Sequence, residues 1–336
     1  MTSTNFTELI DLAAERLGGA VLVASDDFFA PKENLLKPSA PIFIADKYTD
    51  HGKWMDGWES RRRRTPGVDW CIIRLGLPGI IRGVVVDTSF FRGNHPEHCA
   101  LEGATLSSLP THEELTSDAI QWIPLLPQMP LEGDSQNPFP INYAERVTHL
   151  RFKIFPDGGV ARLRVYGEVV PDWEQLKRAG GQIDLAAAEN GALILSCSDM
   201  FFGHHHNLIM PGRAANMSDG WETKRRRGPG HDWVIIKLGR RGHIKRVEVD
   251  TAHFKGNFPE SCSLEACNTE AAATTETLTD LSTPWATVLP RTRLQAHTRH
   301  FFDRELLDTG VASHLRFSIY PDGGVSRLRA YGTLVD

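Results

Sequence analysis

Apolar and polar residues alternate along short segments of this chain, a two-residue period typical of strands with one buried face. In the first half this alternation predicts strands at residues 20–24, 69–75, 80–87, 147–155 and 160–169. In the second half it predicts strands at residues 192–197, 232–238, 243–250, 313–320 and 325–335. Many short strands joined by long loops favour an all-β fold, a sandwich or jelly roll.

Helical periodicity is rare in the chain. The pattern predicts one helix over residues 5–17, where Gly18 and Gly19 supply a C-terminal stop signal. Weaker helical patterns cover residues 112–120 and 171–179. The scarcity of helices strengthens the prediction of an all-β protein.

The chain also repeats itself. The sequence Asp-Gly-Trp-Glu at 56–59 returns at 219–222, and other shared motifs follow it in the same order. Pro-Asp-Gly-Gly occurs in both halves between alternating runs and predicts a hairpin turn, because proline fixes φ and glycine accepts positive φ. We therefore expect two similar β-sandwich domains, with residues 1–170 as the first repeat, 171–181 as a linker and 182–336 as the second repeat.

Composition narrows the class of protein. Of 336 residues, 41% are hydrophobic and 24% are charged, which is typical of globular proteins. The net charge of −5 argues against a nucleic-acid partner, and no apolar run is long enough to cross a membrane. Five cysteines are too few and odd in number for a disulfide framework, so we expect a cytoplasmic protein.

The polar segment at residues 250–265 holds the densest set of candidate site residues. Its candidates are Asp250, His253 and Glu265 for proton transfer, and Lys255 and Asn257 for substrate binding. The segment follows a predicted strand, and catalytic residues commonly lie on loops that a rigid sheet positions. Two carboxylates in different environments can divide acid and base roles. The alternative is structural, because aspartate at a strand end is an ordinary turn former.

The first repeat carries the same segment at residues 87–102, with Arg92 and Asn94 as candidate substrate contacts. It differs in its titratable groups, because Val68 and Phe90 stand where the second repeat has His231 and His253. This asymmetry predicts one competent site or a composite one, with the fuller set of groups in the second repeat.

A second cluster of candidates precedes this segment in the second repeat. His231 and Asp232 are adjacent, and a histidine beside an aspartate can act as an oriented base. Glu222, Arg225 and Arg226 are candidate substrate contacts, since guanidinium groups bind carboxylates through paired hydrogen bonds. The alternative for such an arginine run is a solvated surface paired with nearby glutamates.

Other motifs point to no cofactor. The run of three histidines at 204–206 is absent from the first repeat, and we expect it in an exposed loop rather than at a metal. No phosphate-binding loop, dinucleotide fingerprint or serine-hydrolase elbow occurs in the sequence. We assign no cofactor and no metal, although a divalent ion stays compatible with these His, Asp and Glu residues.

The duplicated motifs together resemble the allantoicase family over nearly the whole chain. The resemblance rests on Asp-Gly-Trp-Glu, the arginine run, Gly-His-Asp-Trp at 230–233 and Gly-Asn-Phe-Pro at 256–259. It implies a tandem pair of jelly-roll, galactose-binding-like domains, a homo-oligomer, and hydrolysis of allantoate to ureidoglycolate and urea in purine and allantoin breakdown for nitrogen metabolism.

The residue types suit that chemistry. As a hypothesis, His253 or His231 is the acid or base, with Glu265 or Asp250 as its partner. The substrate carboxylate would bind Lys255 or Arg225, and Asn257 would bind a ureido oxygen.

Two other functions stay open at this point. A non-catalytic tandem jelly-roll protein could bind carbohydrate through exposed tryptophans at its loop ends. A metal-dependent hydrolase would need three convergent ligands, which the sequence does not single out.

Overall fold

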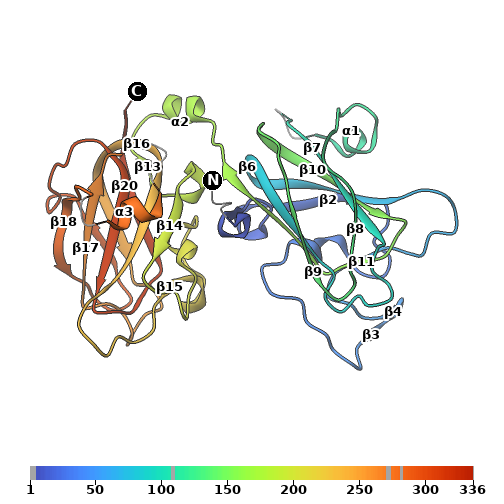
Figure 1. Ribbon diagram of the computed structural model, residues 1–336, viewed down its shortest axis with the longest axis horizontal. Helices are drawn as coiled ribbons and strands as arrows, with labels where there is room; N and C mark the ends of the chain where they lie inside the picture. Colours follow the sequence, from blue (N-terminus) through green and yellow to red (C-terminus); the bar gives the residue numbers. More distant parts are fainter. Residues whose placement is uncertain (1–4, 107–109, 270–273, 281–282, 336) are drawn as a thin grey trace. The chain divides into compact units, whose positions relative to one another are not determined.

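The computed structural model describes residues 5–106, 110–269, 274–280 and 283–335. The chain divides into two compact units, Met1–Val170 and Pro171–Asp336 (Figure 1). None of the helices among the described residues is long and apolar enough to cross a membrane. Both units are built almost entirely from antiparallel strands, which confirms the all-β prediction and the duplication.

The first unit holds twelve strands and one α-helix among its described residues: β1 Ile10–Asp11, β2 Ala20–Ala24, β3 Tyr48–Thr49, β4 Gly52–Lys53, β5 Trp58–Glu59, β6 Asp69–Asp87, β7 His98–Ala104, α1 His112–Thr116, β8 Ile123–Pro130, β9 Gln136–Pro140, β10 Val147–Phe155, β11 Gly159–Val160 and β12 Arg162–Val169. Short 3-10 helices lie at Phe6–Glu8, Glu15–Leu17 and Lys32–Leu36.

Among its described residues, the second unit repeats this order without counterparts of β3 and β4 and with an additional helix at its start: α2 Trp173–Ala179, β13 Ile183–Asp184, β14 Leu193–Cys197, β15 Trp221–Glu222, β16 Asp232–Asp250, β17 Ser261–Cys267, α3 Thr275–Thr279, β18 Ala286–Arg293, β19 Arg299–Phe302, β20 Ala312–Tyr320, β21 Gly324–Val325 and β22 Arg327–Leu334. Its 3-10 helices lie at Ala188–Asn190, His205–Ile209 and Met217–Asp219.

One long strand belongs to both layers of each sandwich. In the first unit, residues 69–74 of β6 pair with β2 and β10, whereas residues 79–87 pair with β9 and β12. One layer is therefore β2-β6-β10-β7-β8 and the other is β9-β6-β12-β1. In the second unit β16 links the layers in the same way.

The sequence pattern divides each of these long strands in two, and that prediction is wrong. The Gly-Leu-Pro-Gly sequence at 76–79 resembles a turn, but the chain only bends there and continues as a strand. The bend brings the backbone close to its neighbours: a Cβ on Gly79 would lie 2.2 Å from the carbonyl oxygen of Glu168. Glycine therefore permits the layer crossing rather than ending the strand.

The predicted helix at residues 5–17 is also wrong. Two 3-10 helices flank β1, which adds to the sheet edge beside β12. Gly18, at φ +93°, does cap the second of these turns as expected. The predictions at 112–120 and 171–179 are confirmed in shorter form, as α1 and α2.

Tryptophans anchor both cores. Trp58 and Trp221 are fully buried, and each indole nitrogen donates a 2.8 Å hydrogen bond to the carbonyl oxygen of Asp26 or Asp199. Both side chains therefore belong to the cores of their sandwiches. Trp70 and Trp233 are only partly buried.

The Pro-Asp-Gly-Gly turns were predicted to form hairpins, and this prediction is wrong. They connect the two layers of each sandwich. β10 and β12 lie in opposite layers and pair separately with β6, so the turn at 156–159 crosses between the layers. Its glycine requirement is confirmed, because Gly158 has φ +133° and Gly323 has φ +130°. Both proline peptide bonds are cis. Each turn lines a cavity at the loop end of its repeat.

Candidate functional site

A cavity of about 890 Å³ opens at the loop end of the second repeat. It is lined by the end of β15, the arginine run, the loop before β17 and the Pro-Asp-Gly-Gly turn. Four of the residues expected to bind substrate come together here: Glu222, Arg225, Arg226 and Asn257.

Glu222 and Asn257 form the polar centre of this cavity. The Asn257 side-chain amide donates a hydrogen bond to the Glu222 carboxylate. The backbone holds both residues: Phe202 and Gly203 donate to the Glu222 carbonyl oxygen, and Gly324 donates to that of Asn257 at 2.8 Å. Glu222 is only partly buried, so its carboxylate can meet a ligand while the surrounding strands fix its position.

The neighbouring arginines have different roles. Arg226 forms an ion pair with Asp232, which is 1% exposed and also accepts a 2.9 Å hydrogen bond from the Ser198 hydroxyl. The Arg226 backbone N–H donates to Asp322 at 2.7 Å, which fixes the arginine run against the turn. Arg225 is exposed and has no ion-pair partner among the described residues. Its guanidinium group is therefore available to an anionic ligand.

The first repeat builds a smaller version of this cavity, of about 360 Å³. Asn94 donates to Glu59 at 2.7 Å, as Asn257 does to Glu222. Arg63 pairs with the buried Asp69 at 3.2 Å, as Arg226 does with Asp232. Burial raises the pKa of Glu59 above its usual range, and the hydrogen bond from Asn94 opposes this shift only in part.

Arg92 does not line the first-repeat cavity. It pairs with Asp134 at 2.9 Å, and its side chain is 80% exposed. Lys255, at the equivalent position in the second repeat, is exposed and lies outside the residues that line the larger cavity. Both residues stay predictions as substrate contacts.

His231 and Glu265 lie in a separate cavity of about 650 Å³ on the face of the second sandwich. Glu265 is paired with Arg316 at 2.8 Å, and the His231 ring lies 4.6 Å from that of Tyr320. Burial, followed by the positive charges of nearby arginines, lowers the pKa of His231. The first repeat fills this space differently, because Lys153 replaces Ser318 and binds Glu102.

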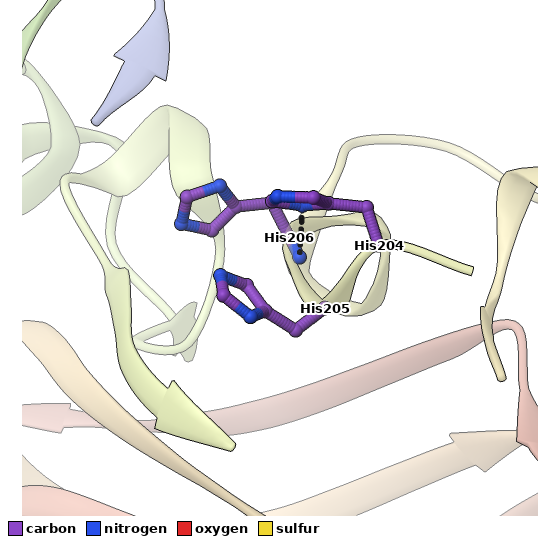
Figure 2. A group of neighbouring side chains, drawn as sticks. All are labelled: His204, His205 and His206. Carbon is purple, nitrogen blue, oxygen red and sulfur yellow. Dashed lines mark hydrogen bonds between the residues drawn. The ribbon is translucent and has the colours of Figure 1, made fainter. Parts of the chain in front are cut away.

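The three consecutive histidines are not an exposed loop as expected. His205 and His206 are buried at 6% and 5% exposure in the 3-10 helix His205–Ile209, and only His204 is exposed (Figure 2). Burial, followed by the charge of His204, lowers the pKa of His205 to about 3. The expectation fails because this helix packs against β14 and β22 instead of projecting from them.

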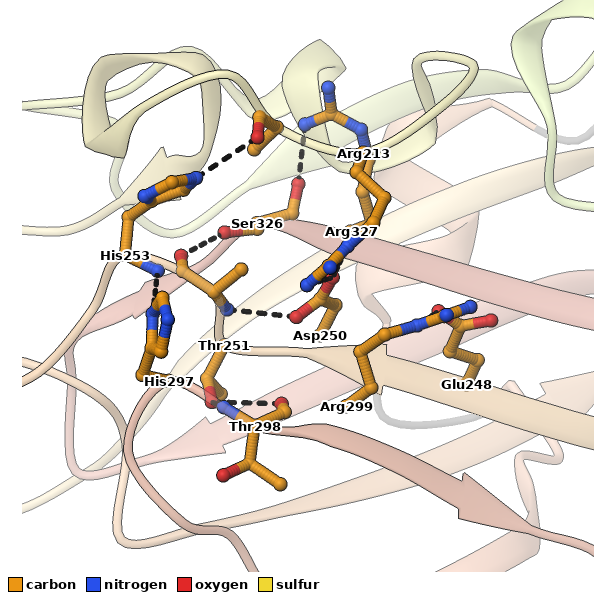
Figure 3. Close-up of polar contacts among 12 residues, drawn as sticks. Arg213, Glu248, Asp250, Thr251, His253, His297, Thr298, Arg299, Ser326 and Arg327 are labelled. Carbon is orange, nitrogen blue, oxygen red and sulfur yellow. Dashed lines mark hydrogen bonds and ion pairs between the residues drawn. The ribbon is translucent and has the colours of Figure 1, made fainter.

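Asp250 and His253 belong to a third group, at the end of β16 (Figure 3). Asp250 pairs with Arg213 at 3.3 Å and accepts a 2.8 Å hydrogen bond from the backbone of Ala252. His253 has φ +71°, its backbone donates to His297 Nδ1 at 2.7 Å, and its Nε2 lies 3.0 Å from the Ala214 carbonyl oxygen. Neither residue lines the two larger cavities.

The five side chains expected to be catalytic therefore lie in three places. His231 and Glu265 share the cavity on the face of the sandwich. Asp232 forms an ion pair with Arg226, which lines the loop-end cavity. Asp250 and His253 stabilise the turn that follows β16. A single site made from all five is not formed.

Sequence reasoning missed several residues that line the loop-end cavity of the second repeat: Thr223, Glu260, Arg293 and Asp322. Two of them had a usable signal, because Glu260 and Asp322 recur in the first repeat as Glu97 and Asp157, which line the smaller cavity.

Comparison with known proteins covers both repeats. A family model described as "Allantoicase repeat" matches residues 10–170 and 183–335. The chain is 48% identical to an allantoicase of Dictyostelium discoideum, covering 98% of this chain and 88% of that protein. It is also 48% identical to a probable allantoicase of Pseudomonas aeruginosa, covering 98% of this chain and 97% of that one.

A solved structure agrees with these sequence matches. Saccharomyces cerevisiae allantoicase shares the fold with a TM-score of 0.79 at 36% identity, covering 96% of this chain and 93% of that one. Near-complete coverage of both repeats, by sequence and by fold, establishes that this chain belongs to the allantoicase family.

Proposed function

We propose that the loop-end cavity of the second repeat is where this member of the allantoicase family hydrolyses allantoate to ureidoglycolate and urea. The observation that carries this proposal is the pairing of Glu222 with Asn257 beside the guanidinium group of Arg225, for which the described part of the chain offers no ion-pair partner. An acidic group, an amide and a cation in one cavity match a substrate that bears a carboxylate and two ureido groups.

Arg225 binds the substrate carboxylate in this account. A guanidinium group presents paired N–H donors that match the two oxygens of a carboxylate. The guanidinium group of Arg226 is held by Asp232, which leaves Arg225 as the more available of the two. The Asn257 amide and the nearby turn would hold the ureido groups.

Glu222 moves the protons. The bond between the central carbon and one ureido nitrogen breaks, that nitrogen gains a proton, and urea leaves. Water supplies a hydroxyl group to the same carbon and gives ureidoglycolate, so one water is consumed for each urea released. A partly buried carboxylate held by an amide is suited to give a proton and then to accept one from water.

The binding role of Arg225 is tested with Arg225→Ala, using Arg227→Ala as the matched control from the same run. Loss of a charge-assisted hydrogen bond should raise KM for allantoate about 10- to 100-fold in the first variant. Arg227 is exposed and does not line the cavity, so its variant should keep the wild-type KM. Equal KM values for all three proteins would remove Arg225 from the binding site.

The cavity that holds His231 and Glu265 provides a direct competitor for this role. His231→Ala should retain urea release within a few-fold of wild type. If this change abolishes turnover in a folded protein, catalysis belongs to that cavity instead. A wild-type protein that releases no urea would favour the carbohydrate-binding alternative.

The cellular setting is part of the same proposal. We infer a cytoplasmic homo-oligomer that serves nitrogen metabolism. All five cysteines lie in the described part of the chain and none is in a disulfide, which fits a reducing compartment.

Residues 39–55 of the first repeat expose Ile42, Phe43, Ile44 and Tyr48 by 41–68%, an apolar surface suited to a second copy. Light scattering that gives the monomer mass would reject the oligomer.

A further inference from the structure

His204, His205 and His206 form a cluster in the second repeat, and none of them lines the cavity of the proposed site. One ring nitrogen from each lies within 4.8 Å of those from the other two (Figure 2). Their ring centroids are 4.4–5.0 Å apart. The three residues lie at the start of a 3-10 helix, where His204 Nδ1 accepts a 3.2 Å hydrogen bond from the His206 backbone, which makes Nε2 the ring nitrogen that His204 would offer to a ligand.

The His205 side chain is prepared for a ligand. Its Nδ1 lies 3.3 Å from the Cys197 sulfur, whereas its Nε2 is buried and has no hydrogen-bond partner among the described residues. A buried ring nitrogen without a partner is costly unless something occupies it. A contact that fixes one ring nitrogen and directs the other to an ion is the usual arrangement of metal-bound histidine.

The first repeat lacks this histidine cluster and has a lysine side chain in its place. Its residues at the four equivalent positions are Ala24, Pro31, Lys32 and Glu33. The Lys32 ammonium group lies 2.8 Å from Glu33 and 3.3 Å from Asp27. The second repeat thus has three imidazoles and a thiol where the first has a salt-bridged lysine.

We propose that His204, His205 and His206 bind one divalent transition-metal ion of the zinc type, with Cys197 orienting His205. Imidazole nitrogens suit zinc, nickel and copper ions, and zinc–nitrogen bonds of about 2.0–2.1 Å place ligand atoms about 3.4 Å apart. Small rotations of the rings close the difference from 4.8 Å. The exposed side of His204 gives the ion a path from solvent.

The ion would stiffen one wall of the loop-end cavity. Phe202 and Gly203 directly precede the histidines in the sequence. Phe202 lines that cavity, and both residues donate backbone hydrogen bonds to the Glu222 carbonyl oxygen. The metal would therefore join this segment to β14 through Cys197 and stabilise the second repeat.

The test uses the full chain stripped of metal and then titrated with Zn²⁺ against a chromophoric chelator. Wild type should bind one ion per chain with high affinity, and Zn²⁺ should raise its Tm. His205→Gln should weaken binding at least tenfold and abolish the Tm rise. His204→Ala makes the same test at an exposed position. Because His204 Nδ1 accepts a 3.2 Å hydrogen bond from the His206 backbone at the start of the 3-10 helix, circular dichroism first verifies that this variant is folded.

His112→Gln serves as the control, because His112 is an exposed histidine on α1 of the first repeat. It should bind Zn²⁺ as wild type does. Wild type that binds no ion, or variants of His204 and His205 that bind as wild type does, would overturn the proposal. None of these readouts depends on allantoate turnover, so the result is independent of the proposed function.

Discussion

At the scale of single residues, a buried histidine makes the stability of this protein depend on pH. His314 is 1% exposed, its Nδ1 lies 2.9 Å from the Ser313 hydroxyl, and burial lowers its pKa to about 4, helped by the charge of Lys237. The unfolded chain would titrate near 6.5. Because the folded state resists the proton, the stability that this group provides above pH 6.5 is lost as the pH falls toward 4.

His314→Gln should remove this pH dependence. Between pH 7 and pH 5, wild type should lose about 1–2 kcal/mol more of its free energy of unfolding than the variant does. Denaturant titrations at both pH values measure the difference. An identical loss in the two proteins would show that His314 is not held neutral in the fold.

Residue types alone could not assign roles at the site. Asp232 beside His231 resembled an oriented acid–base pair, but Asp232 turns inward to hold Arg226 and Ser198. Glu222, predicted as a substrate contact, lines the loop-end cavity, and that role stays a prediction. The misleading signal was adjacency in sequence, since His231 precedes β16 and lines a different cavity, whereas Asp232 begins the strand and is buried.

At the scale of elements, the Pro-Asp-Gly-Gly turns form the cavities by crossing between layers. Gly323 lies against the loop that carries Asn257, and a Cβ there would be 2.6 Å from the Asn257 carbonyl oxygen. In the first repeat, a Cβ on Gly158 would lie 2.7 Å from the Asn94 carbonyl oxygen. The sequence identified these turns and their glycines, but not their partners, because alternation of residues does not reveal which layer a strand joins.

Gly323→Ala should destabilise the second repeat by about 1–3 kcal/mol, because φ +130° and the close carbonyl oxygen both oppose a side chain. The control is Gly256→Ala, since a Cβ on Gly256 would meet nothing within 4 Å. Thermal unfolding should show a lower Tm for the first variant only. Equal Tm values would mean that the turn relaxes without strain.

For the whole molecule, duplication was the most informative signal in the sequence. Ordered matches between the halves predicted two sandwiches, and the structure forms them with equivalent strand orders around β6 and β16. The differences between the repeats were harder to interpret. Val68 and Phe90 in the first repeat predicted one competent site or a composite one, which stays a prediction. The Glu–Asn pair and the supporting arginine are present in both repeats.

The repeats differ in the space around that shared pair. The second-repeat cavity is about 890 Å³, whereas that of the first is about 360 Å³, where Glu59 is buried enough to raise its pKa. Only the larger cavity is proposed to process allantoate, so equivalent substitutions in the two repeats should have unequal effects.

The most direct measurement is therefore urea release from allantoate by wild type, Glu222→Gln and Glu59→Gln, each verified to be folded. Removing the proton-transfer group should lower kcat about 10²- to 10⁴-fold in Glu222→Gln. Glu59→Gln should stay within a few-fold of wild type. Full turnover by a folded Glu222→Gln protein would contradict the assignment of catalysis to the loop-end cavity of the second repeat.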